Sequence, residues 1–150
     1  MIKVAGHWEI GNNCPLLESI RWVYPLREFE VNQWWMHPIT GINNNEQSRV
    51  PLYEKNTIQE ILKENQDVVH VYVEPRNKAE NSIKSVDLRD FKHPKDVLYI
   101  FGSANFSPHI GNKRDKDLAV TVETVQNKGV PWADQILMVI LYDRFIKENY

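Results

Sequence analysis

The chain has 150 residues, and its 18 Lys and Arg residues against 20 Asp and Glu residues give a formal net charge of −2, which excludes a strong overall attraction to phosphates. A single cysteine, Cys14, excludes an internal disulfide and a multi-cysteine zinc site. Because the sequence has no membrane-length apolar run and no signal-peptide pattern, we expect a soluble, cytoplasmic protein of one domain, residues 1–150.

Strands and helices alternate in the first part of the sequence. Residues 2–6 (IKVAG) predict a short strand, and residues 16–24 have the apolar spacing of a helix, which we expect Pro25 to end. The aromatic segment 29–38 (FEVNQWWMHP) predicts a second strand. The segment 40–49, with three consecutive asparagines, predicts a polar loop.

The alternation continues in the middle of the chain. Residues 56–65 (NTIQEILKEN) predict a helix that opens with a capping box, formed by Thr57 and Glu60. Residues 67–75 (DVVHVYVEP) then predict a strand. Residues 88–94 predict a single helical turn that ends before a proline.

The last third begins with residues 97–101 (VLYIF), an unbroken apolar run that is typical of a strand buried on both faces of a parallel sheet. Residues 118–125 (LAVTVETV) predict a further strand. Pro131 is a favourable first residue for a last helix, which carries apolar residues at 136, 137, 140, 141 and 145. The sequence therefore predicts an α/β fold, a mostly parallel sheet flanked by helices.

Two small residues, Gly102 and Ser103, end the apolar run abruptly and begin a polar loop. Open parallel sheets bind their ligands at the carboxyl ends of the strands, so this loop is a candidate binding segment. The alternative is that the two residues only end a buried strand.

Two stretches resemble the SpoU branch of the SPOUT RNA methyltransferases. One is HPKDVLYIFGS (93–103), which a loop, an apolar strand, a second loop and the helix ILMVILYDR (136–144) follow. The other is the pattern at 4–38, in which a short strand, a loop with asparagine, a helix with an arginine and a second strand ending near proline come in turn. The resemblance covers most of the chain. It implies a trefoil knot in the C-terminal half and a homodimer that packs the first and last helices together.

The resemblance also implies a site for S-adenosylmethionine, built from backbone groups of two loops. Glycine suits the first loop, because a backbone that approaches a ligand closely leaves no room for a Cβ atom. The cofactor-binding residues that the resemblance assigns are Phe101, Gly102, Ser103, Val122, Thr124, Gly129 and Pro131.

For catalysis, the resemblance assigns Arg21 on the first helix, where a guanidinium would orient and activate a ribose 2′-hydroxyl electrostatically. The alternative is a structural salt bridge with Glu18, one turn before it. Asn13 and the basic cluster KRDK, with Lys113 and Arg114, are candidate RNA contacts, although the cluster also suits a solvated turn.

Three positions depart from the family pattern. Ala104 stands where the family has a glutamate, and Asn13 lies farther from Arg21 than the family asparagine does. The family's SLN is VPW here, so Trp132 replaces an amide; its ring would stack on an adenine or fill the core.

Metal chemistry is not expected. His7 and Glu9 alternate on the first strand and could line a cleft, but two residues do not make a metal site. The other histidines have no ligand spacing.

The sequence thus suggests two functions. The first is an S-adenosylmethionine-dependent RNA methyltransferase, acting as a homodimer on a ribose 2′-hydroxyl of tRNA; Arg21 and Gly102 favour it. The second is a catalytically weakened SPOUT-like protein that binds a ligand, RNA or a protein without turnover, which Ala104 and Trp132 favour.

Overall fold

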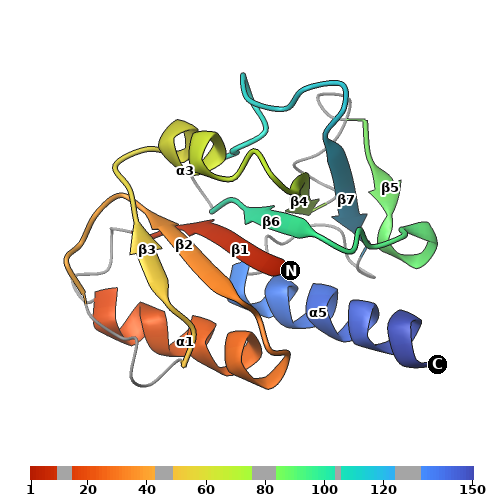
Figure 1. Ribbon diagram of the computed structural model, residues 1–150, viewed down its shortest axis with the longest axis horizontal. Helices are drawn as coiled ribbons and strands as arrows, with labels where there is room; N and C mark the ends of the chain where they lie inside the picture. The colour runs from red at the N-terminus through yellow and green to blue at the C-terminus, as the bar shows by residue number, and fades with distance from the viewer. Residues whose placement is uncertain (10–14, 43–48, 76–83, 104–105, 124–132) are drawn as a thin grey trace.

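A seven-stranded sheet forms the centre of the computed structural model, which describes residues 1–9, 15–42, 49–75, 84–103, 106–123 and 133–150. The strand order is β3-β2-β1-β6-β4-β7-β5, and all neighbouring strands run parallel (Figure 1). The strands are β1 (Ile2–His7), β2 (Gln33–His37), β3 (Leu52–Glu54), β4 (Val69–Pro75), β5 (Val86–Asp87), β6 (Val97–Phe101) and β7 (Leu118–Val122). The predicted α/β fold with a mostly parallel sheet is confirmed.

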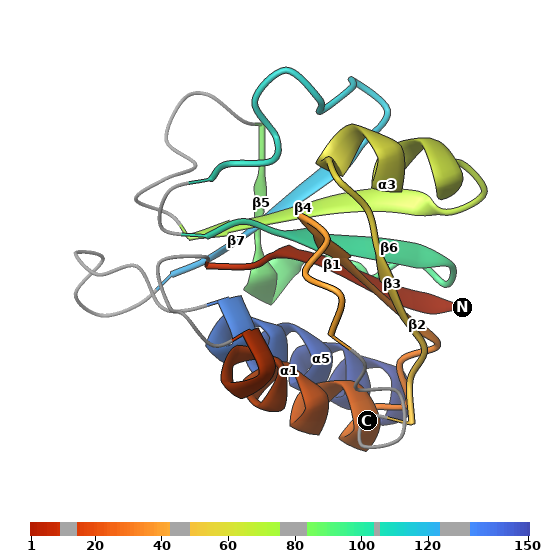
Figure 2. The ribbon, with the colours of Figure 1, turned by 90° about the vertical axis from the view of Figure 1, so that its left-hand side faces the viewer.

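Helices cover both faces of this sheet. Helix α1 (Pro15–Glu28) and helix α5 (Ala133–Asn149) lie side by side on one face, and α3 (Ile58–Glu64) covers the other (Figure 2). A short 3₁₀ helix, η1 (Leu88–Asp90), confirms the predicted helical turn. The predicted cap of α3 is also present, because the Thr57 side chain accepts the N–H of Glu60 at 3.3 Å.

Strand β6 is buried on both faces, as its sequence predicts. Its odd-numbered residues Val97, Tyr99 and Phe101 belong to the core beneath α1 and α5. Leu98 and Ile100 belong to the smaller core beneath α3. The alternation along one strand thus joins the two layers of the molecule.

The prediction that Pro25 ends the first helix is wrong. Helix α1 continues to Glu28, and the N–H of Phe29 still bonds to the carbonyl of Pro25 at 3.2 Å. A proline inside a helix costs about 3 kcal/mol, because it removes one hydrogen bond and crowds the preceding turn. Burial of the next residue, Leu26, against the sheet offsets this cost.

The strands also differ from the prediction at their ends. Because α1 takes up residue 28 and a turn follows it, β2 begins only at Gln33 instead of at residue 29. The strands at the two sheet edges, β3 and β5, were not predicted, because three and two residues are too few to show an alternating pattern. Strand β7 ends at Val122, and residues 124 and 125 of the predicted strand lie outside the described residues.

On α5 the buried face contains a charge where an aromatic residue was expected. Arg144 is buried, whereas Phe145 is 43% exposed. The guanidinium of Arg144 donates to the Tyr99 hydroxyl at 3.0 Å and to the carbonyl of Pro94 at 2.7 Å, which compensates for its loss of water. None of the helices in the described ranges has the length and apolarity that a membrane span requires.

Candidate functional site at the carboxyl edge of the sheet

The edge at which the parallel strands end, called the carboxyl edge below, contains several of the residues that the sequence singles out. Strand β4 lies between β6 and β7, so that Val73 pairs with Phe101 on one side and with Val120 on the other. Gly102 and Val122 therefore lie at the same edge, on either side of the end of β4. The described cofactor-binding candidates at this edge are Phe101, Gly102, Ser103 and Val122.

Gly102 lacks a side chain for a reason within the chain itself. A Cβ atom there would collide with the carbonyl oxygen of Phe106 and lie 2.9 Å from Cδ of Pro108. The loop closes on itself through Ser103, whose N–H donates to the carbonyl of Phe106 at 2.9 Å. A larger residue at position 102 would therefore disrupt this loop even when no ligand is bound, so the need for glycine here does not by itself indicate a ligand.

A buried contact between a carboxylate and an imidazole lies beneath the same loop. Glu74, at the end of β4, is 1% exposed, and its Oε1 lies 3.1 Å from Nδ1 of His109, which is 4% exposed. The carboxylate also lies next to Gly102, 3.4 Å from the place of a Cβ atom. Glu74 thus connects the start of the loop at Gly102 with the turn at His109.

Three rings and a hydroxyl meet beside this loop, at the ends of β1 and β2. Nδ1 of His7 lies 2.9 Å from Oγ of Ser103. The ring of Phe106 stacks on His7 at a centroid distance of 4.8 Å, and the ring of His37 lies 4.8 Å from His7 and 5.0 Å from Phe106. We call these four residues the histidine cluster.

Both imidazoles of the histidine cluster are held in the neutral form at neutral pH. Burial lowers the pKa of His7, and the nearby carboxylate of Glu9 opposes the shift only in part. Burial, with the neighbouring His7, lowers the pKa of His37 to about 4. His37 is 4% exposed, and its Nε2 has no hydrogen-bond partner among the described residues.

Arg21 lies near the same edge, on the opposite face of the sheet. Its Nε lies 3.7 Å from Oδ1 of Asp134, in the first turn of α5, and its side chain is 32% exposed. The expected partner Glu18 is buried, and both of its carboxylate oxygens accept the N–H of Glu9 at 3.1 Å. Burial raises the pKa of Glu18 and of Asp134, and the positive charge of Arg21 opposes both shifts.

The basic cluster lies elsewhere. Nε and an Nη atom of Arg114 bind the two oxygens of Asp117 at 3.1 and 2.9 Å, and the guanidinium also contacts Gln66 and His70. Asp117 precedes β7 and His70 is the second residue of β4, so Arg114 lies at the opposite, amino edge of the sheet. The structure therefore does not bring Arg114 together with Arg21 and Gly102, and its role in RNA binding stays a prediction.

Several predicted residues lie outside the described residues. These are the RNA-binding candidate Asn13, the cofactor-binding candidates Thr124, Gly129 and Pro131, and the departures Ala104 and Trp132. Their assignments stay predictions, as does the knot, which depends on the path of the chain through the same segments.

The described part of the edge suits a donor molecule such as S-adenosylmethionine in one respect. Gly102 is only half-buried, so part of it stays accessible at the edge of the sheet. The half-buried Val122 supplies apolar surface at the same edge, whereas Phe101 is 2% exposed and belongs to the core. No group of three or more metal-ligating side chains occurs within the described part of the chain.

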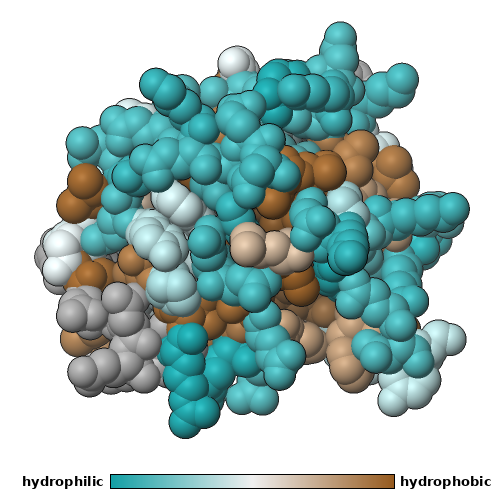
Figure 3. Space-filling view, in the orientation of Figure 1, coloured by the Kyte–Doolittle hydropathy of each residue, from teal (hydrophilic) through white to brown (hydrophobic). Residues whose placement is uncertain are grey.

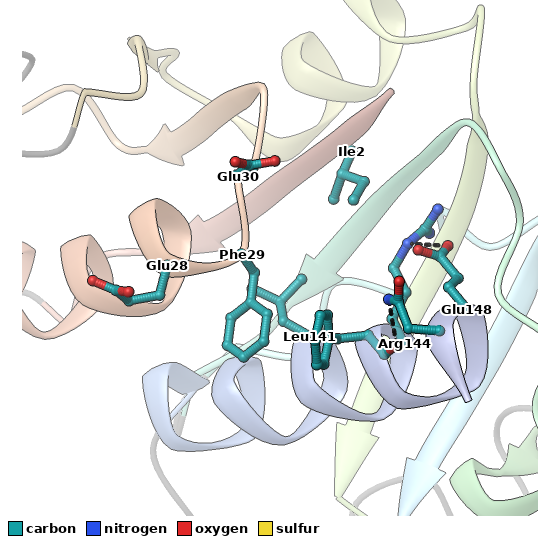
Figure 4. A pocket seen from close by; sticks show the side chains of 9 residues that line it. Ile2, Glu28, Phe29, Glu30, Leu141, Arg144 and Glu148 are labelled. Carbon is teal, nitrogen blue, oxygen red and sulfur yellow. Dashed lines mark hydrogen bonds and ion pairs between the residues drawn. The ribbon is translucent and has the colours of Figure 1, made fainter.

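A cavity of about 450 Å³ lies far from this edge, at the start of β1, between the C-terminal ends of α1 and α5 (Figure 4). Phe29 and Leu141 form apolar walls, and Arg144 makes an ion pair of 2.8 Å with Glu148 at one side. Because it lies at the amino edge, this cavity is separate from the histidine cluster and from Gly102.

The sequence predicts part of this site, because His7 was expected as a residue that could line a cleft. His37, Phe106 and the pair of Glu74 with His109 were not predicted. The available signals were weak: a histidine before Pro38 at the end of a strand, and an acidic residue at the end of an otherwise apolar strand.

Among the comparisons with known proteins, only the one with solved structures gives matches. No protein-family model and no curated protein sequence matches the chain. Among solved structures, a protein of Bacillus anthracis assigned as an RNA methyltransferase is similar with a TM-score of 0.71 at 12% identity, over 100% of this chain and 96% of that one.

Two further structures are longer than this chain. The SpoU methyltransferase AviRb of Streptomyces viridochromogenes, solved with AdoMet, has a TM-score of 0.69 at 11% identity over 99% of this chain and 58% of that one. The TrmH/SpoU tRNA modifying enzyme of A. aeolicus has a TM-score of 0.66 at 17% identity over 98% and 76%. The chain thus has the fold of the SpoU-type methyltransferases, and it spans a little over half of the Streptomyces protein.

Proposed function

We propose that the chain is an RNA methyltransferase that uses S-adenosylmethionine and methylates a ribose 2′-hydroxyl of tRNA in the cytoplasm. The observation that carries the proposal is the similarity in fold, along its whole length, to the Bacillus anthracis protein and to an AdoMet-bound SpoU methyltransferase. At identities of 12% and 11% the function does not follow from the fold alone, so the site residues must support it.

The chemistry of the proposed site divides between two regions. Phe101, Gly102, Ser103 and Val122 would hold the cofactor, with Thr124, Gly129 and Pro131 from the second loop. When bound, the cofactor supplies a methyl group on a sulfonium centre and leaves as a neutral thioether. The protein then needs mainly to align the acceptor oxygen and to stabilise the charge that develops on it. Arg21 would do the latter, since it lies at the rim of the carboxyl edge and is partly exposed.

The test combines donor binding with methyl transfer. Calorimetry with S-adenosylmethionine and with its demethylated product measures the donor site, and transfer of labelled methyl groups to total tRNA measures turnover. Arg21→Ala should lower turnover about a hundredfold or more, the scale on which loss of one electrostatic donor acts. Its donor affinity should stay the same, and Arg21→Lys should restore part of the rate because the charge remains.

Arg27→Ala is the matched control for this test. It removes an arginine from the last turn of the same helix, where an exposed ion pair with Glu28 spans 3.6 Å. Turnover should not change. Equal methylation by a folded Arg21→Ala protein would contradict the role of Arg21, and a parent protein that methylates no tRNA would contradict the proposed function.

The proposed assembly is a homodimer formed by α1 and α5. Leu17 and Tyr24 on α1 are 64% and 58% exposed, and Tyr142 on α5 is 56% exposed. Figure 3 shows apolar surface over these two helices among hydrophilic side chains. Such an apolar surface on adjacent helices is typical of an interface between copies. Sedimentation that shows only monomer at high micromolar concentration would contradict this proposal.

A binding protein without turnover is the second candidate. One observation favours it: Arg21 already faces Asp134 and lies near Glu18, so part of its charge is compensated within the chain. Donor binding without methyl transfer to any RNA fraction would support this candidate. Of the proposed RNA contacts, Asn13, Lys113 and Arg114, the first two would then distinguish RNA binding, because Arg114 is engaged by Asp117.

A further inference from the structure

The proposed reaction needs a group that accepts a proton from the acceptor hydroxyl. An arginine is protonated throughout the physiological range, so Arg21 can stabilise the developing charge but cannot take the proton. The base must therefore be another residue at the carboxyl edge.

Most carboxylates at this edge are already engaged. Glu18 accepts the N–H of Glu9, and Asp134 faces Arg21. Glu54 accepts the Nε1–H of Trp8 at 2.7 Å, and its two oxygens also accept groups of residues 40 and 41. Each of these oxygens would have to give up a contact within the fold before it could take a proton.

The remaining acidic candidates are less suitable still. Glu74 is buried with His109 beneath the loop. Glu9 is half-buried, and a carboxylate is in general a weaker base than an imidazole.

Of the two imidazoles in the histidine cluster, only His7 is accessible. His37 is 4% exposed, whereas His7 is half-buried. The Nδ1 of His7 is engaged by Oγ of Ser103 at 2.9 Å, and its Nε2 has no hydrogen-bond partner among the described residues. If Nδ1 carries the hydrogen and donates it to Ser103, then Nε2 presents a free lone pair.

We propose that His7 is the general base of the methyl transfer and that Ser103 is the positioning residue that holds its ring. This proposal rests on the proposed function. A base that a second group orients through a hydrogen bond is the usual arrangement for general-base catalysis. Here the orienting hydroxyl follows Gly102 directly, so the same loop would position both the donor and the base.

The position of Arg21 is compatible with this role. His7 points to the face of the sheet that α3 covers, because its neighbour two residues earlier, Ala5, packs in the core beneath α3. Arg21 lies on the face of α1 and α5. An RNA strand that lies across the carboxyl edge would meet His7 on one face and Arg21 on the other, so that His7 takes the proton and Arg21 stabilises the charge that develops on the acceptor oxygen.

In the proposed step the acceptor oxygen gives its proton to Nε2 of His7 and forms a bond to the methyl carbon. The bond between that carbon and sulfur breaks, and its electron pair stays on sulfur. His7 becomes an imidazolium and later releases the proton to water. The groups that face His7 are His37 from β2, Ser103 and Phe106 from the loop after β6, and Glu9 from beyond β1.

The test is the pH dependence of methyl transfer between pH 5 and pH 9. The parent should gain about tenfold in kcat/KM per pH unit at the acid end and level off below pH 7, because the pKa of His7 is lowered. His7→Asn keeps a donor near the place of Nδ1 and removes Nε2. The turnover of His7→Asn should fall about a hundredfold or more. The rise of kcat/KM with pH at the acid end, called the acid limb below, should disappear, and the donor affinity measured by calorimetry should stay unchanged.

Two further measurements separate catalysis from structure. Ser103→Ala should keep the acid limb but lower the rate, since the base is present and no longer held. NMR titration of His7 in the parent protein should give the same pKa as the one obtained from the acid limb of the pH profile. This measurement needs no variant, so it stays valid even if a substitution prevents folding. His93→Gln is the control, because His93 lies near α5 at the amino edge and its pKa is also lowered by burial; its acid limb should remain.

The outcomes distinguish the two proposals. A parent that methylates RNA, together with a His7→Asn protein of equal rate and unchanged acid limb, overturns the role of His7 alone. An NMR pKa of His7 that differs from the acid limb by more than one unit also overturns it. A parent that binds the donor and methylates no RNA overturns the proposed function, and the base with it.

Discussion

The two edges of the sheet treat buried polar groups differently. At the amino edge, the fully buried hydroxyl of Tyr99 lies 2.6 Å from Nδ1 of His93 and accepts from Arg144, and His93 reaches Asp143 at 2.8 Å. Asp143 in turn pairs with Lys147 at 2.8 Å. At the carboxyl edge, Nδ1 of His7 lies 2.9 Å from Oγ of Ser103, whereas Nε2 of His37 has no hydrogen-bond partner among the described residues.

Protonation states explain the closed network at the amino edge. Burial raises the pKa of Tyr99 to about 12 and lowers the pKa of His93, so both are neutral at pH 7. Neutral His93 can then accept the Tyr99 hydroxyl on Nδ1 and donate its Nε2–H to Asp143. A closed network of this kind stabilises the fold, whereas an incompletely paired cluster keeps atoms available for a ligand.

The largest expected effect concerns the closed network. Arg144→Met should lower the free energy of unfolding by about 3–5 kcal/mol, because the buried hydroxyl of Tyr99 and the carbonyls of Pro94 and Lys95 lose their donor. Urea unfolding at pH 7 measures the change. Arg27→Met is the control, and it should cost less than about 1 kcal/mol because its ion pair is exposed. If Arg144→Met and Arg27→Met lower the free energy of unfolding equally, the closed network stabilises the fold no more than an exposed ion pair does.

Acid should weaken the fold through the carboxyl edge. Above pH 6.5 His37 is neutral in both states; below it, the unfolded chain takes up a proton that folded His37 does not accept until about pH 4. The free energy of unfolding should therefore fall between pH 6.5 and pH 4, by up to about 3 kcal/mol from this residue. Urea unfolding of the parent and of His37→Gln across this range isolates the contribution. Parallel curves for the two proteins would show that His37 does not contribute.

The smallest expected effect concerns the loop that follows β6 and contains Gly102 and Ser103. Gly102→Ala should cost about 1–3 kcal/mol, because the new methyl group meets the carbonyl of Phe106. Gly111→Ala is the control: nothing lies within 4 Å, and its φ of +75° alone should cost about 1–2 kcal/mol. If Gly102→Ala costs nothing, the loop can move away, and the glycine must then serve a bound ligand.

The contrast between the edges also explains what sequence could predict. The burial of β6 could be predicted from VLYIF, because five consecutive apolar residues are enough to indicate a strand that is buried on both faces. The extension of α1 beyond Pro25 could not be predicted, because it depends on how Leu26 packs against the sheet. Strands β3 and β5 are too short to carry a periodic signal.

The site was harder to predict than the fold for the same physical reason. The histidine cluster joins residues 7, 37, 103 and 106, which parallel pairing of β1 with β2 and β6 brings together across the sequence. The spacing of residues along the sequence does not indicate that these four side chains lie together. The family resemblance indicated the loop at Gly102 and the place of Arg21, but it could not indicate His37 or the pair of Glu74 with His109.

The short strands at the two edges of the sheet have a consequence for the behaviour of the protein in concentrated solution. β3 contributes three residues and β5 only two, so few backbone N–H and C=O groups remain for a strand of another molecule. Long, flat edges are the usual starting point of strand-to-strand aggregation, and this sheet has none among its described strands. The proposed homodimer would instead use helix surfaces, where assembly stops at a closed pair and does not grow into fibres.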